Sequence, residues 1–223
     1  MISLLAAHLT SAQLLLDSSR LEEAASHLQK AQAIYEGLGE DNPARKAYCT
    51  GLVGALQKLG HQERLGGRMD PALASYEKAR SLAAEFVRRH PNQQYERQLL
   101  ATLQRLIGQV HAKRGHWDQA ADAFRQAIAL RERLVQENAP YAHLRNSLVG
   151  VCEELGNVLA RSERLEEALA AYNRATTHAQ SAQDPGLDST KQRDRLARIK
   201  ASAERVRQRL RPVPEVGKPP PRN

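Results

Sequence analysis

The sequence predicts an all-α fold, a solenoid of stacked antiparallel helix pairs. The first reason is composition, because the 223 residues include 34 Ala and 30 Leu but only 10 Val and 5 Ile, a balance that favours helices over strands. The second is an internal repeat of 48 residues, which aligns Ala24, Ala72, Ala120 and Ala168. A repeat of this length built from amphipathic segments indicates units that bury their apolar faces against their neighbours.

Each repeat is expected to hold two helices, and the third repeat shows both clearly. The first, over residues 95–114, carries Leu99 and Leu103 on one face, with further apolar residues at spacings of three and four. The second, over 117–137, has the same kind of pattern. Gly115 lies between them and suits the left-handed turn that commonly ends a helix.

Helix starts are predicted from capping residues. Ser19 and Glu22 have the spacing of a capping box for the second helix of the first repeat. Asp70 followed by Pro71 suits an N-cap and a first helical position in the second repeat. The prolines at 43, 91 and 140 are expected to separate one repeat from the next, because proline stops the preceding helix.

Small residues recur where the two helices of a repeat should meet. Ala12, Gly60, Gly108 and Gly156 share one repeat position. We expect them to face the alanines at 24, 72, 120 and 168 and so allow a close approach of the paired helices. A bulky set is assigned to the core rather than to a stacking surface for nucleic-acid bases: Leu28, Tyr76, Phe124 and Tyr172.

The predicted domain organisation is an array, a cap and a tail. The array covers residues 1–183, in units of about 1–43, 44–91, 92–139 and 140–183. Residues 187–211 form a basic capping helix, because Leu196, Ile199, Ala203, Val206 and Leu210 make one apolar stripe among charged residues. Residues 212–223 hold five of the ten prolines, and we expect a Pro-rich disordered tail there.

The N-terminal edge of the array is expected to be apolar and uncovered. Ile2, Leu4, Leu5 and Leu9 have no preceding repeat to pack against. Two alternatives follow: the chain is part of a longer protein, or this edge is an interface through which the chain self-associates.

The net charge of +8 is unevenly distributed. Residues 187–223 hold 11 Lys and Arg against 4 Asp and Glu, whereas residues 1–186 hold 22 against 21. The basic helix could contact phosphates, but its cations surround the helix and no aromatic residue lies among them. A solvated cap face is therefore favoured over nucleic-acid binding, with an acidic protein partner as an intermediate interpretation.

No catalytic motif is found, and the expectation is a protein that is not an enzyme, with no cofactor and no metal. No Walker A loop, G-x-S-x-G elbow or H-E-x-x-H motif is present. Cys152 fits a core position and Cys49 a half-exposed one, and neither has a second ligand at metal spacing. With no membrane span or signal peptide predicted either, a cytoplasmic location is expected.

At these repeated positions the sequence resembles the tetratricopeptide repeat family. The second repeat carries the family pattern in Leu56, Leu59-Gly60, Ala72, Tyr76 and Ala79, and the third and fourth repeats carry it at equivalent positions. The family's usual repeat has about 34 residues, so both helices must be longer here. The resemblance implies a right-handed superhelix. With its longer helices, this array is similar to the long-helix arrays of large bacterial signalling proteins.

The resemblance also implies a function, which is a scaffold that binds a protein or peptide partner in a concave groove lined by the first helices. The alternative is a C-terminal regulatory or substrate-docking part of a larger bacterial signalling enzyme, such as a serine/threonine kinase. The family's carboxylate clamp is not reproduced. Projection of the family's groove positions gives nine polar residues: Gln57, His61, Arg64, Arg105, Gln109, Lys113, Glu153, Asn157 and Arg161.

Overall fold

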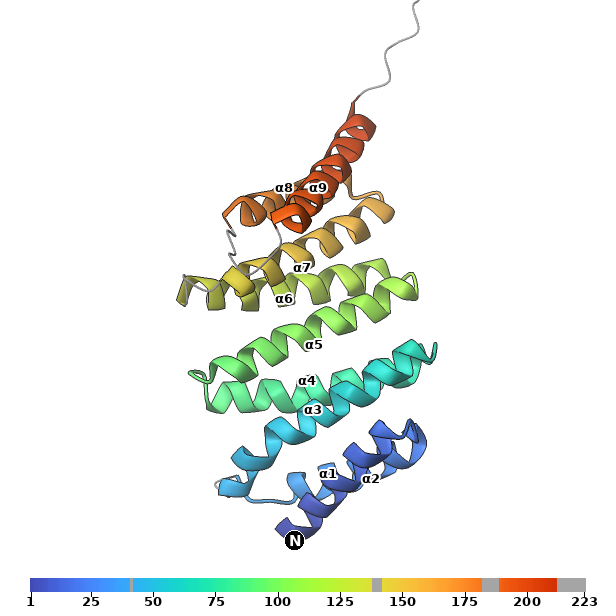
Figure 1. Ribbon diagram of the computed structural model, residues 1–223, viewed down its shortest axis with the longest axis vertical. Coiled ribbons are helices and arrows are strands. Elements are labelled where there is room, and N and C mark those ends of the chain that lie inside the picture. The colour runs from blue at the N-terminus through green and yellow to red at the C-terminus, as the bar shows by residue number, and fades with distance from the viewer. Residues whose placement is uncertain (41, 138–141, 182–188, 212–223) are drawn as a thin grey trace, which may run out of the picture. The chain divides into compact units, whose positions relative to one another are not determined.

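The computed structural model describes residues 1–40, 42–137, 142–181 and 189–211. Within these ranges it contains nine helices and no strand (Figure 1), as predicted. The helices are α1 (Ile2–Asp17), α2 (Leu21–Glu36), α3 (Pro43–Leu65), α4 (Met69–Arg89), α5 (Gln94–Lys113), α6 (Trp117–Glu137), α7 (Ala142–Arg161), α8 (Leu165–Ser181) and α9 (Ser189–Leu210). The predicted disordered tail lies outside the described residues.

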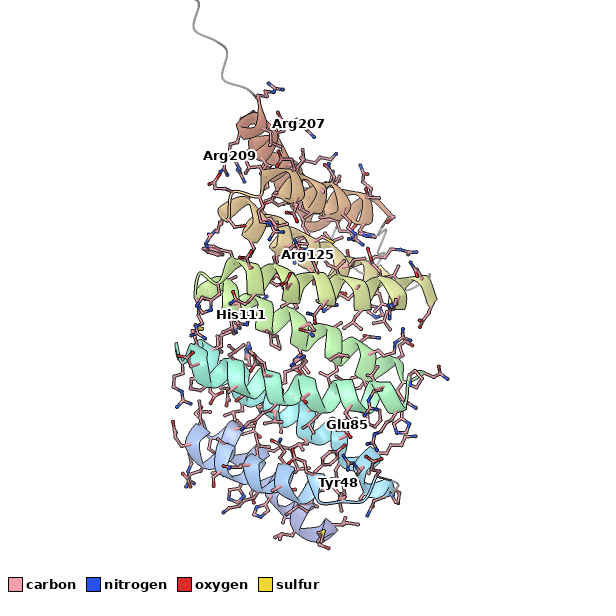
Figure 2. The ribbon with its side chains drawn as sticks, turned by 180° about the vertical axis from the view of Figure 1, so that it is seen from behind. Tyr48, Glu85, His111, Arg125, Arg207 and Arg209 are labelled. Atoms are coloured by element: carbon pink, nitrogen blue, oxygen red, sulfur yellow. The ribbon has the colours of Figure 1, made fainter. Side chains whose placement is uncertain are left out.

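The chain divides into two compact units, unit 1 (Met1–Leu144) and unit 2 (Arg145–Asn223). In unit 1, consecutive helices pack as α1–α2, α3–α4 and α5–α6. The first helices of these pairs also contact one another, α1 with α3 and α3 with α5. Figure 1 shows α3 in front of α4, and Figure 2, from behind, shows α4 in front of α3. Unit 1 therefore has one layer of first helices and one of second helices.

The turn inside each helix pair has the same backbone geometry. One residue of each turn has a left-handed backbone, and these residues lie 48 positions apart. They are Ser19 (φ 57°), Gly67 (φ 78°), Gly115 (φ 75°) and Glu163 (φ 60°). The next residue donates its N–H to a carbonyl five residues earlier, as in Arg68 to Glu63 at 2.8 Å. This is the bond of a Schellman motif, which glycine adopts without strain. The sequence interpretation of Gly115 is therefore correct.

Two predicted helix starts are wrong. Ser19 has a left-handed backbone and α2 begins after Arg20, which lies at the N-cap without a side-chain capping bond. The Schellman turn requires that conformation of Ser19, so its hydroxyl is not placed to cap α2. The start of α4 has Arg68 at the N-cap and Asp70 within the first turn. Asn42 does cap a helix, since its Oδ1 accepts from the Ala44 N–H at 2.9 Å.

The prolines also have different roles from one another. Pro43 is the first residue of α3 rather than the end of a preceding helix, which fits its missing N–H and fixed φ. Pro91 follows the His90 C-cap of α4, as expected for a helix stop. Pro140 lies outside the described residues.

The repeated glycines contact aromatic rings rather than mainly alanines. A Cβ added to Gly60 would lie 2.8 Å from the Tyr76 ring and 3.1 Å from the Ala72 carbonyl oxygen. The nearest atoms to such a Cβ on Gly108 belong to Phe124, at 2.7 Å. Gly156 has the same relation to Tyr172 in unit 2, at 2.7 Å. The glycines are therefore needed because a ring from the paired helix packs directly against their backbone.

The N-terminal edge differs from the expectation. Leu5 and Leu9 are buried, with 0% and 7% of their surface exposed, because they lie on the face of α1 that packs on the core. Ile2 and Leu4 are exposed as predicted, and Leu14 is exposed on the same helix. Leu4 and Leu14 lie ten residues apart, almost three helical turns, and both point away from the core. The uncovered apolar edge is thus made of Ile2, Leu4 and Leu14.

In unit 2, α9 packs on α8 through the predicted apolar stripe. Ile199, Ala203 and Val206 are buried, and Leu196 and Leu210 are half-buried. The arginines of α9 bind the ends of α7, since Arg195 donates to the Asn146 carbonyl oxygen at 3.2 Å and Arg209 to that of Ala160 at 3.3 Å. The helix is a cap held by both burial and polar contacts.

Both cysteines lie in the core. Cys49 is buried, with 1% of its surface exposed, which corrects the half-exposed position predicted for it. Burial raises the pKa of its thiol. Cys152 is buried as expected.

Candidate functional site

The predicted groove residues of α3 share one side of the helix. Gln57 and Arg64 are half-buried and His61 is exposed. They are separated by four and three positions, so they form a row along the helix. Arg64 Nη2 lies 3.3 Å from His61 Nδ1. The neighbouring Gln62 donates to the Leu16 carbonyl oxygen at 2.8 Å and so ties α3 to the end of α1.

The predicted groove residues of α5 lie on a recessed helix. Arg105 and Gln109 are half-buried, and Lys113 is exposed in the last turn. From Glu96 to Ala112 every residue of α5 is buried or half-buried. The two helices together place Arg64, Arg105 and Lys113 in one layer of unit 1, and no acidic residue is among the six predicted positions. This surface can offer hydrogen-bond donors and positive charge.

The predicted groove residues of unit 2 already have partners within the unit. Glu153 accepts from Arg198 at 3.0 Å and lies 3.5 Å from Arg195, so α9 neutralises its charge. Asn157 Oδ1 accepts from the Tyr172 hydroxyl at 2.7 Å. Arg161 is exposed and interacts with a neighbour. In unit 2 these polar groups contribute to the packing of α7, α8 and α9.

Tyr76 in unit 1 occupies the repeat position that Tyr172 occupies in unit 2. The two hydroxyls have different environments. The Tyr76 oxygen is buried and makes no hydrogen bond within the described part of the chain, and the same is true of Arg64 Nε. Burial raises the pKa of Tyr76, and the positive charge of Arg64 opposes this shift. Burying polar atoms without a hydrogen bond is costly. The repeat pattern predicts Tyr76 as a core residue and gives no sign of this polar end.

The described residues were also searched for a metal site. No group of three or more His, Cys, Asp or Glu side chains in them could hold a metal ion. His8 and His27 do meet, with 3.1 Å between their Nδ1 atoms, but as a pair between α1 and α2. Within the same ranges, no helix has the length and apolarity that crossing a membrane requires.

Comparisons with solved structures identify the fold. A yeast histone chaperone, Hif1, described as a scaffold protein recruiting protein complexes to core histones, is similar with a TM-score of 0.60 and 15% identity, over 92% of this chain and 95% of that one. BtubC from P. vanneervenii is similar with a TM-score of 0.57 and 18% identity, over 95% and 81%. A Podospora anserina protein described as a kinesin light chain with nearly identical TPR-like repeats has a TM-score of 0.56 and 15% identity, over 93% of each chain.

This chain has the tetratricopeptide-like solenoid fold. No family model and no curated protein matches its sequence. The tetratricopeptide-like pattern was nevertheless visible in the sequence, because a glycine and an aromatic residue recur at fixed positions in three repeats, and Ala12 and Leu28 stand at those positions in the first repeat. The division of the tetratricopeptide-like array at residues 43, 91 and 139 stays a prediction.

Proposed function

We propose that this protein is an interaction scaffold that binds an extended segment of a partner on the first-helix face of unit 1. That face consists of the exposed sides of α3 and α5, with Gln57, His61, Arg64, Arg105, Gln109 and Lys113. The signalling-enzyme alternative stays a prediction from the sequence. So do a role for unit 2 in partner binding and self-association through the N-terminal edge.

The observation that carries the proposal is the packing of the first helices. Contacts join α1 to α3 and α3 to α5, so this layer is the more closely spaced one in unit 1. A stack of helix pairs curves toward its closer-spaced layer, and the inner surface of such a curve suits an extended ligand. The Arg64 Nε atom, which makes no hydrogen bond to the described residues, lies on this layer, and the Tyr76 hydroxyl, which also makes none, lies on the paired helix α4. A partner that draws Arg64 toward itself can relieve that cost.

A peptide-display selection against the whole chain would supply a ligand to test the proposal. The selected peptide is then titrated onto the double variant Arg64→Ala with Arg105→Ala. We expect a loss of at least about tenfold in affinity, since two charge-assisted hydrogen bonds are removed. The matched control is Arg20→Ala with Arg125→Ala, two arginines on second helices or their connections, which should leave the affinity unchanged.

Salt dependence separates this face from the basic helix α9. A ligand held by hydrogen bonds and apolar contacts on α3 and α5 should lose little affinity as salt rises. A ligand of α9 should weaken steeply, as phosphate and acidic partners do. Charge reversal at Arg198, Arg205 and Arg209 that abolishes binding, with the groove variant binding normally, would contradict the proposal.

A further inference from the structure

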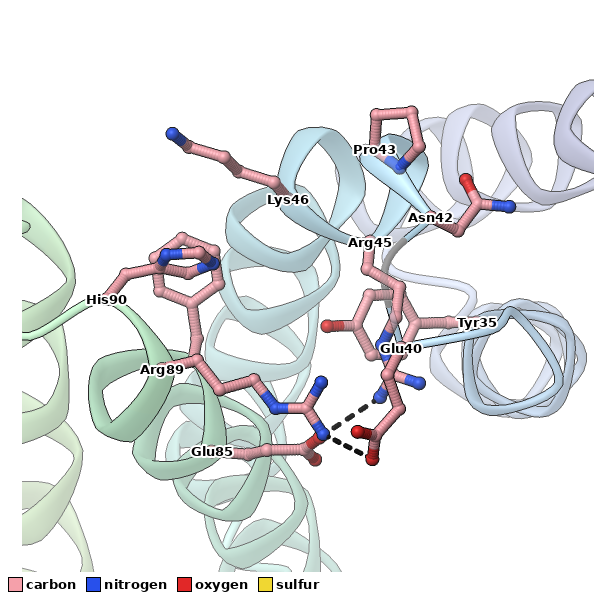
Figure 3. A pocket seen from close by; sticks show the side chains of 10 residues that line it. Tyr35, Glu40, Asn42, Pro43, Arg45, Lys46, Glu85, Arg89 and His90 are labelled. Atoms are coloured by element: carbon pink, nitrogen blue, oxygen red, sulfur yellow. Dashed lines mark hydrogen bonds and ion pairs between the residues drawn. The ribbon is translucent and has the colours of Figure 1, made fainter.

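A pocket of about 290 Å³ opens in unit 1 where the end of α2, the start of α3 and the end of α4 meet (Figure 3). It does not involve the first-helix positions discussed above. Its charged lining comes from three separate segments of the chain: Glu40, Arg45, Lys46, Glu85 and Arg89. In Figure 3 the side chains of Arg45, Glu85, Arg89 and Glu40 point toward one another.

One side of the pocket is held rigidly by Arg45. Its guanidinium donates to the Leu38 carbonyl oxygen at 2.9 Å and to Glu85 Oε1 at 3.1 Å. Its central carbon also lies 4.9 Å from the centre of the Tyr35 ring, a cation–π contact. Only 14% of the Arg45 side chain is exposed. Arg45 and Glu85 therefore form a fixed wall.

The opposite contact, between Arg89 and Glu40, is loosely held. Arg89 Nη2 lies 2.7 Å from Glu40 Oε1 and 3.0 Å from Glu85 Oε1. The Glu40 side chain is 76% exposed and comes from the connection between α2 and α3, whereas Arg89 is 27% exposed. Ion pairs with so exposed a partner are weak and break at little cost. The Glu40 carboxylate occupies a position that another carboxylate can take.

Charge favours a carboxylate over a doubly charged group at this position. Without Glu40, the pocket retains Arg45, Lys46 and Arg89 against the single carboxylate of Glu85. Lys46 is exposed and lines the pocket. A phosphate bound to Arg89 would place two negative charges beside Glu85. The contact with Glu40 shows directly that a carboxylate fits.

We propose that this pocket binds a glutamate or aspartate side chain from an acidic segment of a partner protein, and that Glu40 is an internal competitor which the partner displaces. The arginine fork of Arg89 receives the incoming carboxylate, while Arg45 and Glu85 keep that fork in place. Lys46 adds a second cation at the rim. The site is separate from the first-helix face and stands whether or not that face binds a peptide.

The test is isothermal titration calorimetry of the full chain with a capped tetraglutamate peptide at low salt. Glu40→Gln should bind about two- to fivefold more tightly than the native chain, the gain expected from removing one exposed competitor. Arg89→Gln should bind at least about fivefold more weakly, because the charge-assisted bonds are lost. Lys46→Gln should bind about twofold more weakly.

Matched controls come from Arg20, the N-cap residue of α2, and Glu23 in its first turn, which form an exposed ion pair. Glu23→Gln changes the net charge as Glu40→Gln does, and Arg20→Gln as Arg89→Gln does, yet neither should alter binding. An equal gain in Glu23→Gln, or no gain in Glu40→Gln, would overturn the proposal. Tighter binding of inorganic phosphate than of tetraglutamate would overturn the choice of ligand. If Arg89→Gln fails to fold, the affinities of Glu40→Gln and Lys46→Gln for tetraglutamate still test the proposal.

Discussion

Tyr76 in unit 1 and Tyr172 in unit 2 occupy one repeat position but have different polar surroundings. Both rings pack on a glycine of the paired helix. In unit 2 the hydroxyl donates to Asn157 at 2.7 Å. In unit 1 the residue at the position of Asn157 is His61, whose Nδ1 lies near Arg64, and the Tyr76 hydroxyl is left without a hydrogen bond.

Because of this difference, polar residues at equivalent positions of the first helices make different contacts in the two units. Unit 2 uses its first-helix polar residues to hold α8 and α9, as the contacts of Asn157 and Glu153 show. In unit 1, His61 and Arg64 contact each other at 3.3 Å, and Arg64 lies close enough to Tyr76 to oppose the rise of its pKa. A groove position projected from a family pattern can therefore be structural in one repeat and available in another.

The largest expected effect is a loss of stability when the glycine under the aromatic ring, a feature of both units, is replaced. Gly108→Leu in unit 1 and Gly156→Leu in unit 2 should each lower the free energy of unfolding by about 1–3 kcal/mol or more, since the added atoms overlap an aromatic ring. Denaturant unfolding of each variant measures the loss. Because the ring contact is the same, the two losses should be similar.

Gly54→Ala supplies the control for these variants. A Cβ on Gly54 meets no atom within 4 Å, and Gly54 lies inside α3. Alanine should therefore stabilise the chain by about 0.5–1 kcal/mol through helix propensity. A loss in this variant would show that glycine is required for a reason other than the ring contact.

A smaller effect separates the two tyrosines. Asn157→Ala removes the acceptor of the Tyr172 hydroxyl and should cost about 1 kcal/mol of stability. His61→Ala breaks no bond to Tyr76 and should stay within about 0.5 kcal/mol of the native chain. Thermal unfolding measures both. Equal losses would mean that His61 stabilises unit 1 as Asn157 stabilises unit 2.

The left-handed turns give a third comparison. Ser19→Gly should raise the free energy of unfolding by about 0.5–1 kcal/mol, because glycine adopts the positive φ without strain. Glu163→Gly in unit 2 should gain less, since it also removes the ion pair with Arg209. Chemical denaturation of the two single variants measures both gains. A larger gain in the unit 2 variant would contradict a stabilising role for that pair.

The smallest effect is a pH dependence in unit 1. Burial lowers the pKa of His8 from 6.5, and the charges of His27 and Lys30 lower it further. The folded chain then binds fewer protons than the unfolded chain, so stability is complete above about pH 6.5 and falls as the pH drops below it. The urea midpoint should decrease between about pH 7.5 and 5.5. His8→Gln should show a smaller decrease, and an unchanged decrease would exclude His8 as the source.

Much of the fold was predictable because it depends on periodic apolar burial and on local turn chemistry. The 48-residue repeat located the helices and the left-handed Gly115. The errors arose where one residue has two possible roles. Ser19 resembles a capping residue in sequence, but the Schellman turn fixes its backbone. Leu5 lies next to the exposed Leu4, and only the helix packing decides which of the two is buried.

The candidate site was less predictable. The first-helix positions follow from the repeat, yet the partners of Glu153 on α9 depend on a contact across 45 residues. The pocket around Arg89 follows no motif, because Glu40 and Arg89 are 49 residues apart and belong to neighbouring repeats. Such a cluster exists only once the helix pairs are stacked.

The identical turns at Gly67 and Gly115 also bear on how the length of this protein can change. A cut after each of these residues falls at the same backbone conformation and the same Schellman bond, 48 positions apart. Removing residues 68–115 would join Gly67 to His116 with the local hydrogen bonding at the junction preserved, and duplicating them would do the same. Unequal recombination at these points would yield shorter or longer chains with intact turns. The length of the first-helix face could thus vary in evolution, or be varied by design, in whole helix pairs.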